Sequence, residues 1–288
     1  MAKLRKFVTN TATQLSNFWG TLKMTSENIY AIVVLYNKNL SESITFNCLK
    51  SIDSNIQIFI CDNSDDKKYA ANNKIASNYK NVHYKSMNGN KGLSSAYNAA
   101  IEDIVKLSPG WICLFDDDTL VPAEYFTLLS EEKRTQKADI YLPLVYDEIG
   151  LLSPNIMRKY FCHRANSINE INIGEISAIN SGMVLSSEIF KTYRYDENYF
   201  LDFVDHAFMR DMRYLHKKVA IFNCKLKQNF AANTNDIASL KKRFKILKKD
   251  LRYFYSKLNF GSLYYLYIIS KRKIRIFLNV KKASTLFW

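Results

Sequence analysis

The chain has little of what marks fibrous, secreted or membrane-spanning proteins. Eight glycines and four prolines in 288 residues argue against collagen-like and low-complexity classes. The five cysteines are scattered without a CxxC spacing and lie mostly in apolar runs, which favours buried free thiols in a reducing compartment over disulfides or a zinc site. No stretch approaches 18 consecutive apolar residues, so no transmembrane helix is predicted. The basic residues 1–7 are not followed by an apolar core, so they lack the pattern of a secretory signal.

The charge of the chain is uneven along its length. The net charge is +14, but residues 217–288 carry 18 lysines and arginines against two acids, Asp236 and Asp250, a balance of +16. Residues 1–216 therefore carry only −2. A basic last quarter indicates an anionic partner for that part of the chain: membrane lipid, nucleic acid or a phosphate-bearing substrate.

Alternating strand and helix patterns predict an α/β domain with a central, mostly parallel sheet flanked by helices. With 48% hydrophobic residues the chain can fill a large core. The predicted strands are Ile29–Tyr36, Ile56–Cys61, Val82–Tyr84, Trp111–Phe115, Ile140–Leu142, Ile179–Leu185 and Val219–Phe222. Residues 146–176 have weak periodicity, and we expect an irregular excursion there that faces the substrate.

The same patterns divide the chain into three parts. Residues 1–27 are polar and form a predicted extension, in which Met24 is an alternative start. Residues 28–232 form the α/β domain. Residues 233–288 form a basic, amphipathic and helical C-terminal region.

Three consecutive carboxylates, Asp116, Asp117 and Asp118, follow the predicted strand Trp111–Phe115. The carboxyl ends of strands are where open α/β sheets bind their ligands. Adjacent acids repel one another unless a cation or hydroxyl groups balance the charge. On an extended chain Asp116 and Asp118 point the same way, so they are the natural pair for a divalent cation with oxygen ligands. A solvated acidic turn is the alternative that these residues alone leave open.

The segment Met87–Ala100 is a second candidate for ligand contact. Gly89 and Gly92 permit a tight turn and a close approach of the backbone to a ligand. The Ser/Ala-rich run after them predicts a helix whose N-terminus would face an anion. The segment lacks the GK[ST] ending of a P-loop, so it is a weak signal by itself.

The C-terminal region has the pattern of two basic amphipathic segments. One apolar stripe comprises Leu240, Phe244, Leu247, Leu251 and Phe254 or Tyr255. A second apolar cluster at residues 263–269 leads into Lys271–Lys273. Basic segments with aromatic residues suit the interface of a membrane that carries anionic lipid. A helix pair packed on the domain with a solvated basic face is the alternative, and both can hold.

Six short motifs occur in a characteristic order. They are Val33–Asn37 (VVLYN), Cys61–Ser64 (CDNS), Asn90–Asn98 (NKGLSSAYN), Leu114–Thr119 (LFDDDT), Asn180–Met183 (NSGM) and Phe200–Asp205 (FLDFVD). Together they resemble the family 2 glycosyltransferases with a GT-A fold, in particular the rhamnosyltransferase-like branch. The resemblance covers about residues 29–260 and is carried by the order of the motifs, since each alone is weak.

The resemblance implies inverting transfer of a sugar from a nucleotide-diphosphate sugar, of the dTDP-rhamnose or UDP-hexose type, to a hydroxyl of a polysaccharide or lipid-linked oligosaccharide. Tyr36 and Asp62 would hold the nucleobase, and Lys91 and Gly92 would line the nucleotide pocket. The further substrate contacts that it implies are Asp116, Asp117, Asn180, Gly182, Asp202 and Arg210. Mg²⁺ or Mn²⁺ bound by Asp116 and Asp118 would neutralise the diphosphate leaving group.

Asp205 matches the catalytic base of the family, which removes the proton of the acceptor hydroxyl. A carboxylate at the start of a helix can instead cap that helix, and the residue pattern alone leaves both roles open. Asp202 is the second candidate base. Arg210 and Arg213 on the following helix could contact the diphosphate or pair with surface acids.

Two positions depart from the family pattern. The family often has a histidine metal ligand after the last core strand, and Gln228 stands about where it is expected. An amide oxygen can bind Mg²⁺ but is a poorer ligand than imidazole for Mn²⁺. The arginine after the base falls at Arg210, one residue early. The histidines that the chain does have show no convincing ligand spacing; they are His83, His163, His206 and His216.

Two other classes of function compete with a transferase. Phosphatases of the haloacid-dehalogenase type also use a DxD at a strand end, but they want Thr or Val at position 120, where this chain has Leu. A nucleic-acid binder would explain the basic tail but not the acidic site, so no nucleic acid is expected. We therefore expect a cytoplasmic enzyme, peripheral to the inner membrane, that builds a surface polysaccharide such as O-antigen or capsule.

Overall fold

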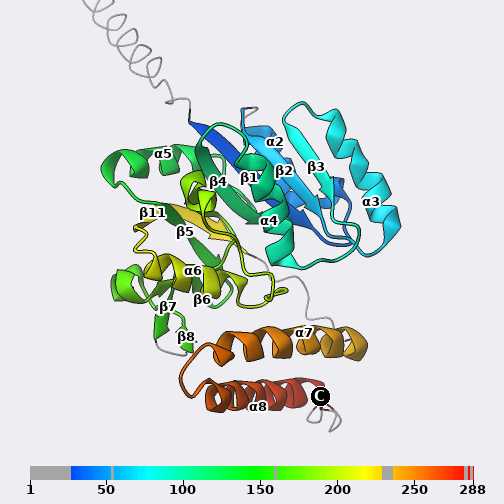
Figure 1. Ribbon diagram of the computed structural model, residues 1–288, viewed down its shortest axis with the longest axis vertical. Coiled ribbons are helices and arrows are strands. Elements are labelled where there is room, and N and C mark those ends of the chain that lie inside the picture. Colours follow the sequence, from blue (N-terminus) through cyan, green and yellow to red (C-terminus); the bar gives the residue numbers. More distant parts are fainter. Residues whose placement is uncertain (1–26, 53–54, 159–160, 229–235, 282–284, 286–287) are drawn as a thin grey trace, which may run out of the picture.

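The computed structural model describes residues 27–52, 55–158, 161–228, 236–281, 285 and 288 (Figure 1). The predicted extension, apart from Glu27, lies outside the described residues, as does the predicted boundary between residues 232 and 233.

One large sheet forms the centre of the described structure. Its strands are β1 (Asn28–Leu35), β2 (Gln57–Asp62), β3 (Val82–Ser86), β4 (Gly110–Asp116), β5 (Ile140–Asp147), β6 (Gly150–Ser153), β10 (Met183–Ser186) and β11 (Val219–Lys227). The order across the sheet is β11-β5-β10-β4-β1-β2-β3, with β6 paired to β5. Strands β4, β1, β2 and β3 are parallel to one another, as β11 is to β5, whereas β10 and β6 run antiparallel to their neighbours. The predicted mostly parallel sheet is therefore confirmed.

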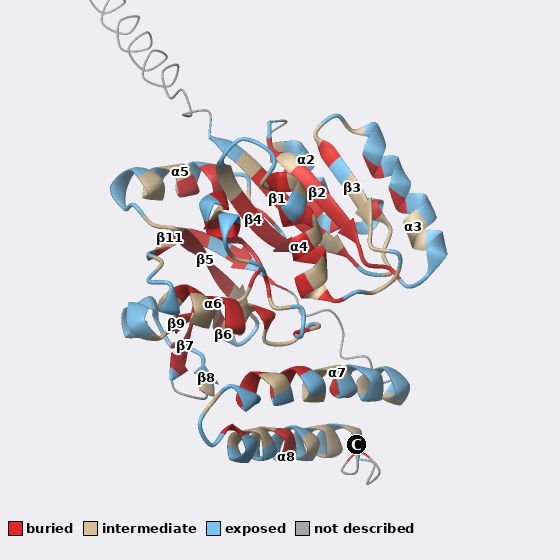
Figure 2. Ribbon diagram, in the orientation of Figure 1, coloured by how far each residue is buried: buried red, intermediate tan, exposed pale blue. Residues whose placement is uncertain are grey.

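Helices cover both faces of this sheet. They are α2 (Ile44–Ile52), α3 (Lys67–Asn73), α4 (Leu93–Ile104), α5 (Tyr125–Thr135) and α6 (Val204–Tyr214). Alternate residues of β1 point to opposite faces, so Ile32 lies in one core with side chains of α4 and α6, and Val33 lies in another with side chains of α2 and α5. The burial pattern in Figure 2 follows this arrangement, with buried strands between helices whose outer faces are exposed.

The segment between β6 and β10 differs from its prediction. Instead of an irregular excursion it holds a small antiparallel sheet of β7 (Asn155–Arg158), β8 (Phe161–His163) and β9 (Ile176–Ser177), in the order β8-β7-β9. Strands of two to four residues are too short to show a two-residue period in the sequence, which explains the miss. The strand predicted at Ile179–Leu185 begins only at Met183.

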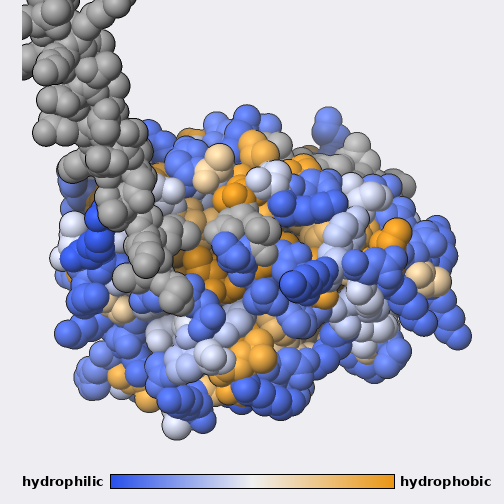
Figure 3. All heavy atoms as spheres, turned by 90° about the horizontal axis from the view of Figure 1, so that it is seen from above, coloured by the Kyte–Doolittle hydropathy of each residue, from blue (hydrophilic) through white to orange (hydrophobic). Residues whose placement is uncertain are grey.

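The C-terminal region forms an antiparallel helix pair, α7 (Ile237–Ser256) and α8 (Gly261–Val280), which lies across one end of the domain (Figure 1). Helix α7 buries Phe244, Leu251 and Phe254 in the core that also contains side chains of α6. Helix α8 lies on the outer side of α7 and buries little of its surface (Figure 2). The opposite end of the molecule is mostly hydrophilic, with hydrophobic residues toward its middle (Figure 3). In the described chain, no helix is long and apolar enough to cross a membrane.

Candidate active site

The strand register brings the predicted site segments to one edge of the sheet. Val34 of β1 pairs with Asp116 at the end of β4, and Leu35 pairs with Asp62 at the end of β2. Because these strands are parallel, the loops that follow them leave the sheet side by side. The three motifs around Tyr36, Asp62 and Asp116 therefore meet in space, as their order in a βαβ fold predicts.

Of the three consecutive carboxylates, Asp117 is turned into the protein. Its carboxylate pairs with Lys38 at 2.9 Å, and its carbonyl oxygen accepts hydrogen bonds from Ser43 and Thr45. Burial raises the pKa of Asp117, and Lys38 opposes that rise. In the described chain Asp118 has no hydrogen-bond or ion-pair partner. Asp117 thus has a structural partner, while Asp118 is left available for a ligand.

The charged form of Asp116 is disfavoured by its surroundings. Burial, together with the charges of Asp118, Asp117 and Asp205, raises the pKa of Asp116 to about 7. The side-chain amide of Gln228 donates to Asp116 at 3.0 Å and opposes this rise. A group of carboxylates that raise one another's pKa favours binding of a cation, which would relieve the repulsion.

Gln228 lies where a third oxygen ligand would be needed. It is 9% exposed, follows β11, and its Oε1 is buried without a hydrogen-bond partner. The NH₂ group of the amide faces Asp116, so the oxygen could join Asp116 in binding a cation only if the amide turned over and the cation took up the charge between the two oxygens. The described residues contain no group of three or more His, Cys, Asp or Glu side chains that could hold a metal ion. The fit for a cation therefore depends on Asp116, Asp118 and this amide oxygen, a set of hard ligands that suits Mg²⁺.

The motif around Asn180 lies against the acidic segment. Thr119 and Ser181 share a hydrogen bond of 2.6 Å, and the Gly182 amide donates to the Leu114 carbonyl. Gly182 has φ +77, and a Cβ there would collide with Leu226 and Pro143. Asn180 is buried and its Oδ1 has no hydrogen-bond partner, so the motif contains one buried polar atom whose hydrogen-bonding capacity is unused.

The predicted nucleobase residues have different environments. Asp62 is fully buried, and its carboxylate accepts hydrogen bonds from Asn73, Tyr84 and the Ser64 amide. It therefore holds the loop after β2 together, and contact with a nucleobase would require it to give up these partners. Tyr36 is 42% exposed and donates to Asp65, an exposed carboxylate that the sequence did not single out.

Gly92 is packed against the segment that precedes the predicted base. It has φ +89, and a Cβ would lie 2.7 Å from the Phe200 carbonyl oxygen. The next amide, of Leu93, donates to that same oxygen at 2.6 Å. Asn63 holds the loop from the other side by bonding the backbone of Lys91 and Gly92, and the Lys91 side chain is exposed. The glycine is required here because the two loops approach closely.

Asp205 occupies the first turn of α6. The N-cap position is taken by Phe203, with φ +63 and no side-chain cap, so Asp205 is not the capping residue. Its Oδ1 accepts a hydrogen bond from the His206 amide. Burial lowers the pKa of His206, but Asp205 and Cys162 outweigh that effect and raise it to about 9. Asp205 is therefore not the N-cap residue, but its carboxylate accepts an N–H of the first turn and still stabilises the start of α6.

Tyr97 of α4 is a site residue that the sequence reasoning missed. Its hydroxyl is buried without a hydrogen-bond partner. Burial raises the pKa of Tyr97 well above its usual value, and the charges of Asp116 and Asp205 add to the effect. The phenol therefore lies near both carboxylates. Its place in the motif Asn90–Asn98, four residues after Leu93 on one helix face, was the available signal.

Asp202 and the two arginines face the C-terminal helices and their neighbours. Asp202 forms an ion pair through both oxygens with Arg243 of α7, and its side chain is 16% exposed. Arg210 pairs with Asp211 at 3.1 Å and lies over the Phe254 ring. Contact of Asp202 with a substrate would require loss of Arg243, whereas Nη1 of Arg210 is buried without a hydrogen-bond partner. Substrate contact by either residue remains a prediction. Arg213 is similarly occupied, because it donates to the Ile176 carbonyl.

The segment before Asp205 is anchored by Asp250 of α7. This carboxylate is fully buried and accepts the backbone amides of Phe200, Leu201 and Asp202 at 3.1, 2.8 and 2.8 Å. The sequence offered a signal that was not used, because Asp250 is the one acid in residues 237–288. An isolated acid inside a basic amphipathic helix needs a local partner, and here it is the backbone of the loop.

Comparison with solved structures supports the GT-A fold. The crystal structure of GalNAc-T7 with UDP, GalNAc and Mn²⁺ is similar with a TM-score of 0.58 at 13% identity, over 78% of this chain and 48% of that chain. The crystal structure of S. aureus TarS gives a TM-score of 0.52 at 17% identity, over 77% and 38% of the two chains. At these identities the likeness shows the fold alone.

Sequence comparison identifies the family. The dTDP-rhamnosyl transferase RfbF of Shigella flexneri is 27% identical over 192 residues, which are 62% of this chain and 61% of RfbF. The alignment thus spans about three fifths of that relative. The family model for glycosyl transferase family 2 matches residues 30–220, about two thirds of the chain and all of the strands from β1 to the start of β11. The chain therefore belongs to glycosyl transferase family 2.

Proposed function

We propose that this glycosyltransferase moves a sugar, with inversion, from a nucleotide-diphosphate sugar to a hydroxyl of a saccharide or lipid-linked acceptor. The observation that carries the proposal is that Asp116 ends strand β4 and Asp118 follows it at the carboxyl edge of the sheet, where the charge of Asp205 also acts on Asp116. The similarity to a dTDP-rhamnosyl transferase favours dTDP-rhamnose as the donor, with UDP-hexoses as the alternative. Family membership also favours transfer over the phosphatase and nucleic-acid interpretations.

Asp205 is the proposed base. It would accept the proton of the acceptor hydroxyl as the oxygen attacks the anomeric carbon from the face opposite the diphosphate. Unlike Asp202, it forms no ion pair with an arginine or lysine among the described residues. Its Oδ1 accepts the His206 amide and its charge raises the pKa of His206, so Oδ2 is the atom proposed to take the proton. Tyr97, near both Asp205 and Asp116, would position the reacting groups between them.

Donor binding is proposed for the loops after β1, β2 and β3. Tyr36 and Asp65 form an exposed polar pair beside the nucleobase position, while Asp62 supports the loop from beneath. Lys91 and Gly92, at the start of α4, would contact the nucleotide. Asn180 would use its free Oδ1 on the sugar.

Mg²⁺ or Mn²⁺ fits the proposed site through Asp116, Asp118 and Gln228. When bound, the cation would offset the negative charge that develops on the diphosphate leaving group. The repulsion that raises the pKa of Asp116 supports this assignment, as does the buried Oε1 of Gln228.

Peripheral attachment to an anionic membrane from the cytoplasmic side is proposed for the C-terminal helix pair. Helix α8 exposes apolar side chains, among them Phe260, Leu263 and Leu278, and carries several lysines and arginines. Such a helix is suited to lie in the interface rather than to span the bilayer. An enzyme attached there would build a surface polysaccharide such as O-antigen or capsule.

Thermal unfolding with a panel of nucleotide-diphosphate sugars, with and without Mg²⁺ or Mn²⁺, tests the proposal. We expect one donor to raise the melting temperature in a metal-dependent way, and Asp118→Ala to abolish that rise. Glu188→Ala is the matched control, because this exposed acid pairs with Lys191 away from the site. A metal-dependent rise that persists in Asp118→Ala would exclude the metal assignment, and no rise with any donor would exclude the function.

A further inference from the structure

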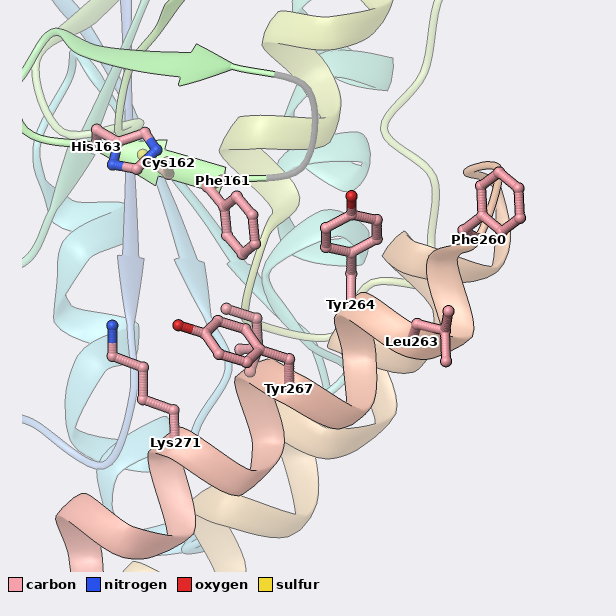
Figure 4. Close-up of a pocket in the computed structure, with 9 residues that line it drawn as sticks. Phe161, Cys162, His163, Phe260, Leu263, Tyr264, Tyr267 and Lys271 are labelled. Atoms are coloured by element: carbon pink, nitrogen blue, oxygen red, sulfur yellow. The ribbon is translucent and has the colours of Figure 1, made fainter.

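A cavity of about 710 Å³ lies between the small sheet and the last helix. Strand β8 contributes Phe161, Cys162 and His163 to its wall, and α8 contributes Tyr264, Tyr267 and Lys271, which reach toward β8 (Figure 4). Leu263 of α8 also lines the cavity, on the side near Phe260. Only β8 lies within residues 30–220, the part that matches the family. The cavity is therefore not defined by the family match and is a feature of this chain.

Aromatic rings hold the two walls of the cavity at a fixed separation. Phe161 makes edge-to-face contacts with Tyr264 and Tyr267, with ring centroids 5.4 and 5.9 Å apart. Such pairs stabilise a contact beyond the area that they bury. The wall is thus preformed, as small-molecule sites usually are.

The cavity is continuous with an exposed apolar stripe of α8. Its wall residues Leu263 and Tyr267 are 66% and 56% exposed, and Ile274 and Leu278 continue the same helix face at 53% and 63%. Steps of three and four residues place these positions on one side of a helix. The other side of α8 is the one packed on the protein, where Ile269 is buried. An apolar ligand could therefore enter the cavity along the stripe.

The charge at the inner end of the cavity is positive. Lys271 faces it, and none of its wall residues is acidic. His163 adds ring nitrogens that can form hydrogen bonds. Lys271 has no acidic partner in the described part of the chain. Arg272 and Arg275 lie within one turn of Lys271 and add to the positive field. A ligand that fits must therefore carry an anionic group next to an apolar segment.

The cavity is linked to the proposed base. The strand β8 that forms one wall pairs with β7, and β7 pairs with β9. Ser177 of β9 shares a hydrogen bond of 2.8 Å with His206, the residue that follows Asp205. The small sheet therefore connects the cavity wall to the segment of the proposed base.

We propose that this cavity binds the lipid-phosphate end of a lipid-linked acceptor. The apolar chain lies along Phe260, Leu263 and Tyr267, the phosphate meets Lys271 and His163, and the saccharide extends toward Asp205. This assignment rests on the proposed transferase function, and it explains why a concave aromatic site and an exposed apolar stripe occur together. A free saccharide would use the aromatic rings but not the stripe, and a flat membrane surface would use the stripe but not the cavity.

Binding of dodecyl phosphate below its micelle concentration, measured by calorimetry, tests the proposal. We expect Lys271→Gln and Tyr267→Ala each to weaken binding by about tenfold or more, the equivalent of roughly 1.4 kcal/mol. Lys74→Gln and Tyr214→Ala are the matched controls, since both replace exposed residues outside the cavity and should bind like the unaltered protein. Inorganic phosphate and dodecyl maltoside should each bind much more weakly than dodecyl phosphate.

Three results would overturn the proposal: equal binding by the cavity variants, equal binding of dodecyl maltoside, or attachment to phosphatidylglycerol vesicles with no binding of dodecyl phosphate. The last would indicate a membrane contact alone. Donor-induced thermal shifts in the same variants separate this proposal from the transferase function. If the shifts persist while lipid-phosphate binding is absent, only the cavity assignment fails. If no donor shifts any variant or the parent protein, the proposed function itself fails.

Discussion

Replacement of Asp250 by alanine should weaken the protein through the loop that carries the proposed base. The buried carboxylate accepts three backbone amides, of Phe200, Leu201 and Asp202, at 2.8 to 3.1 Å. The same loop presents the Phe200 carbonyl to Leu93, and Arg243 binds its Asp202 side chain. Alanine would therefore leave three amides without acceptors and Arg243 without the nearby charge of Asp250.

The expected loss is large for a single substitution. A hydrogen bond to a charged group contributes about 1.5–3 kcal/mol, and breaking a buried charged contact by removing one partner costs about 3–5 kcal/mol. Water can reach part of the loop, since Phe200 is only half-buried and Leu201 is 39% exposed, so the sum of three full hydrogen bonds is an upper limit. We expect Asp250→Ala to lower the free energy of unfolding by about 3–5 kcal/mol, and the melting temperature by on the order of 10 °C.

Asp250→Asn should fall between the parent protein and Asp250→Ala. Phe200 donates to Oδ1, and Leu201 and Asp202 donate to Oδ2. Asparagine has only one such oxygen, so its NH₂ group must face at least one of the three amide donors. Urea unfolding measures the stability of both variants, and initial rates well below the melting temperature measure the effect on kcat and on the KM of the donor.

The matched control for this series is Asp236→Ala. Asp236 is also an acid of α7, but it caps the start of the helix through the amides of Ala238 and Ser239 and does not touch the loop. Its loss should cost about 1 kcal/mol and leave kcat unchanged. The reasoning is refuted if Asp250→Ala lowers the free energy of unfolding by no more than Asp236→Ala does. It is also refuted if Asp250→Ala is less stable but has unchanged kcat and KM, because the loop then does not depend on α7.

Two further predictions concern the carboxylates of the site. Asp205→Asn should reduce kcat by roughly 100- to 10,000-fold with donor-induced thermal shifts preserved, because the amide oxygen can still accept from His206 but cannot take a proton; near-normal turnover would assign the base elsewhere. The pKa of Asp116 is about 7 in the folded protein and ~3.9 for an unfolded aspartate, so the folded state binds the proton more tightly and stability from this group declines as pH rises from about 4 through about 7. In EDTA, Asp116→Asn should therefore have a higher melting temperature than the parent protein at pH 8, and this difference in melting temperature should disappear near pH 4. An equal difference at both pH values would show that the pKa of Asp116 is not raised in the folded protein.

The sequence predicted the elements whose signal is local and long enough to be periodic. The apolar run before Asp116 predicts β4, and parallel register then brings Tyr36 and the loop after Asp62 to the same edge. The family resemblance also predicted that Gln228 would stand near the acidic segment, and its amide does bond Asp116 across 112 positions of the chain. These successes share one cause, because each depends on the order of strands rather than on side-chain packing.

What the sequence did not predict depends on tertiary contacts. Nothing in the CDNS motif shows that Asp62 turns inward to Asn73 and Tyr84 while Asp65 stays exposed. Nothing near Asp202 shows that a residue 41 positions later will neutralise it. The two candidate bases are Asp202 and Asp205. They differ in whether helix α7, which lies beyond the family match, covers them. Only the structure shows that Asp202 pairs with Arg243 while Asp205 forms no ion pair with an arginine or lysine among the described residues.

The two C-terminal helices therefore differ in what their charges do. Helix α7 buries Asp250 and leaves Arg243 half-exposed, and both side chains bind the loop of residues 200–202 that precedes Asp205. Helix α8 turns Ile269 inward, leaves Lys271 without an acidic partner among the described residues, and keeps most of its apolar stripe exposed. A region that served only to bind a membrane would not need a buried acid that binds the loop before Asp205. A region that served only to stabilise this loop would not keep an apolar helix face exposed. The pair is better explained if α7 shapes the transfer site while α8 meets the acceptor, so that the helix positioning the base is packed directly against the helix that receives the molecule to be glycosylated.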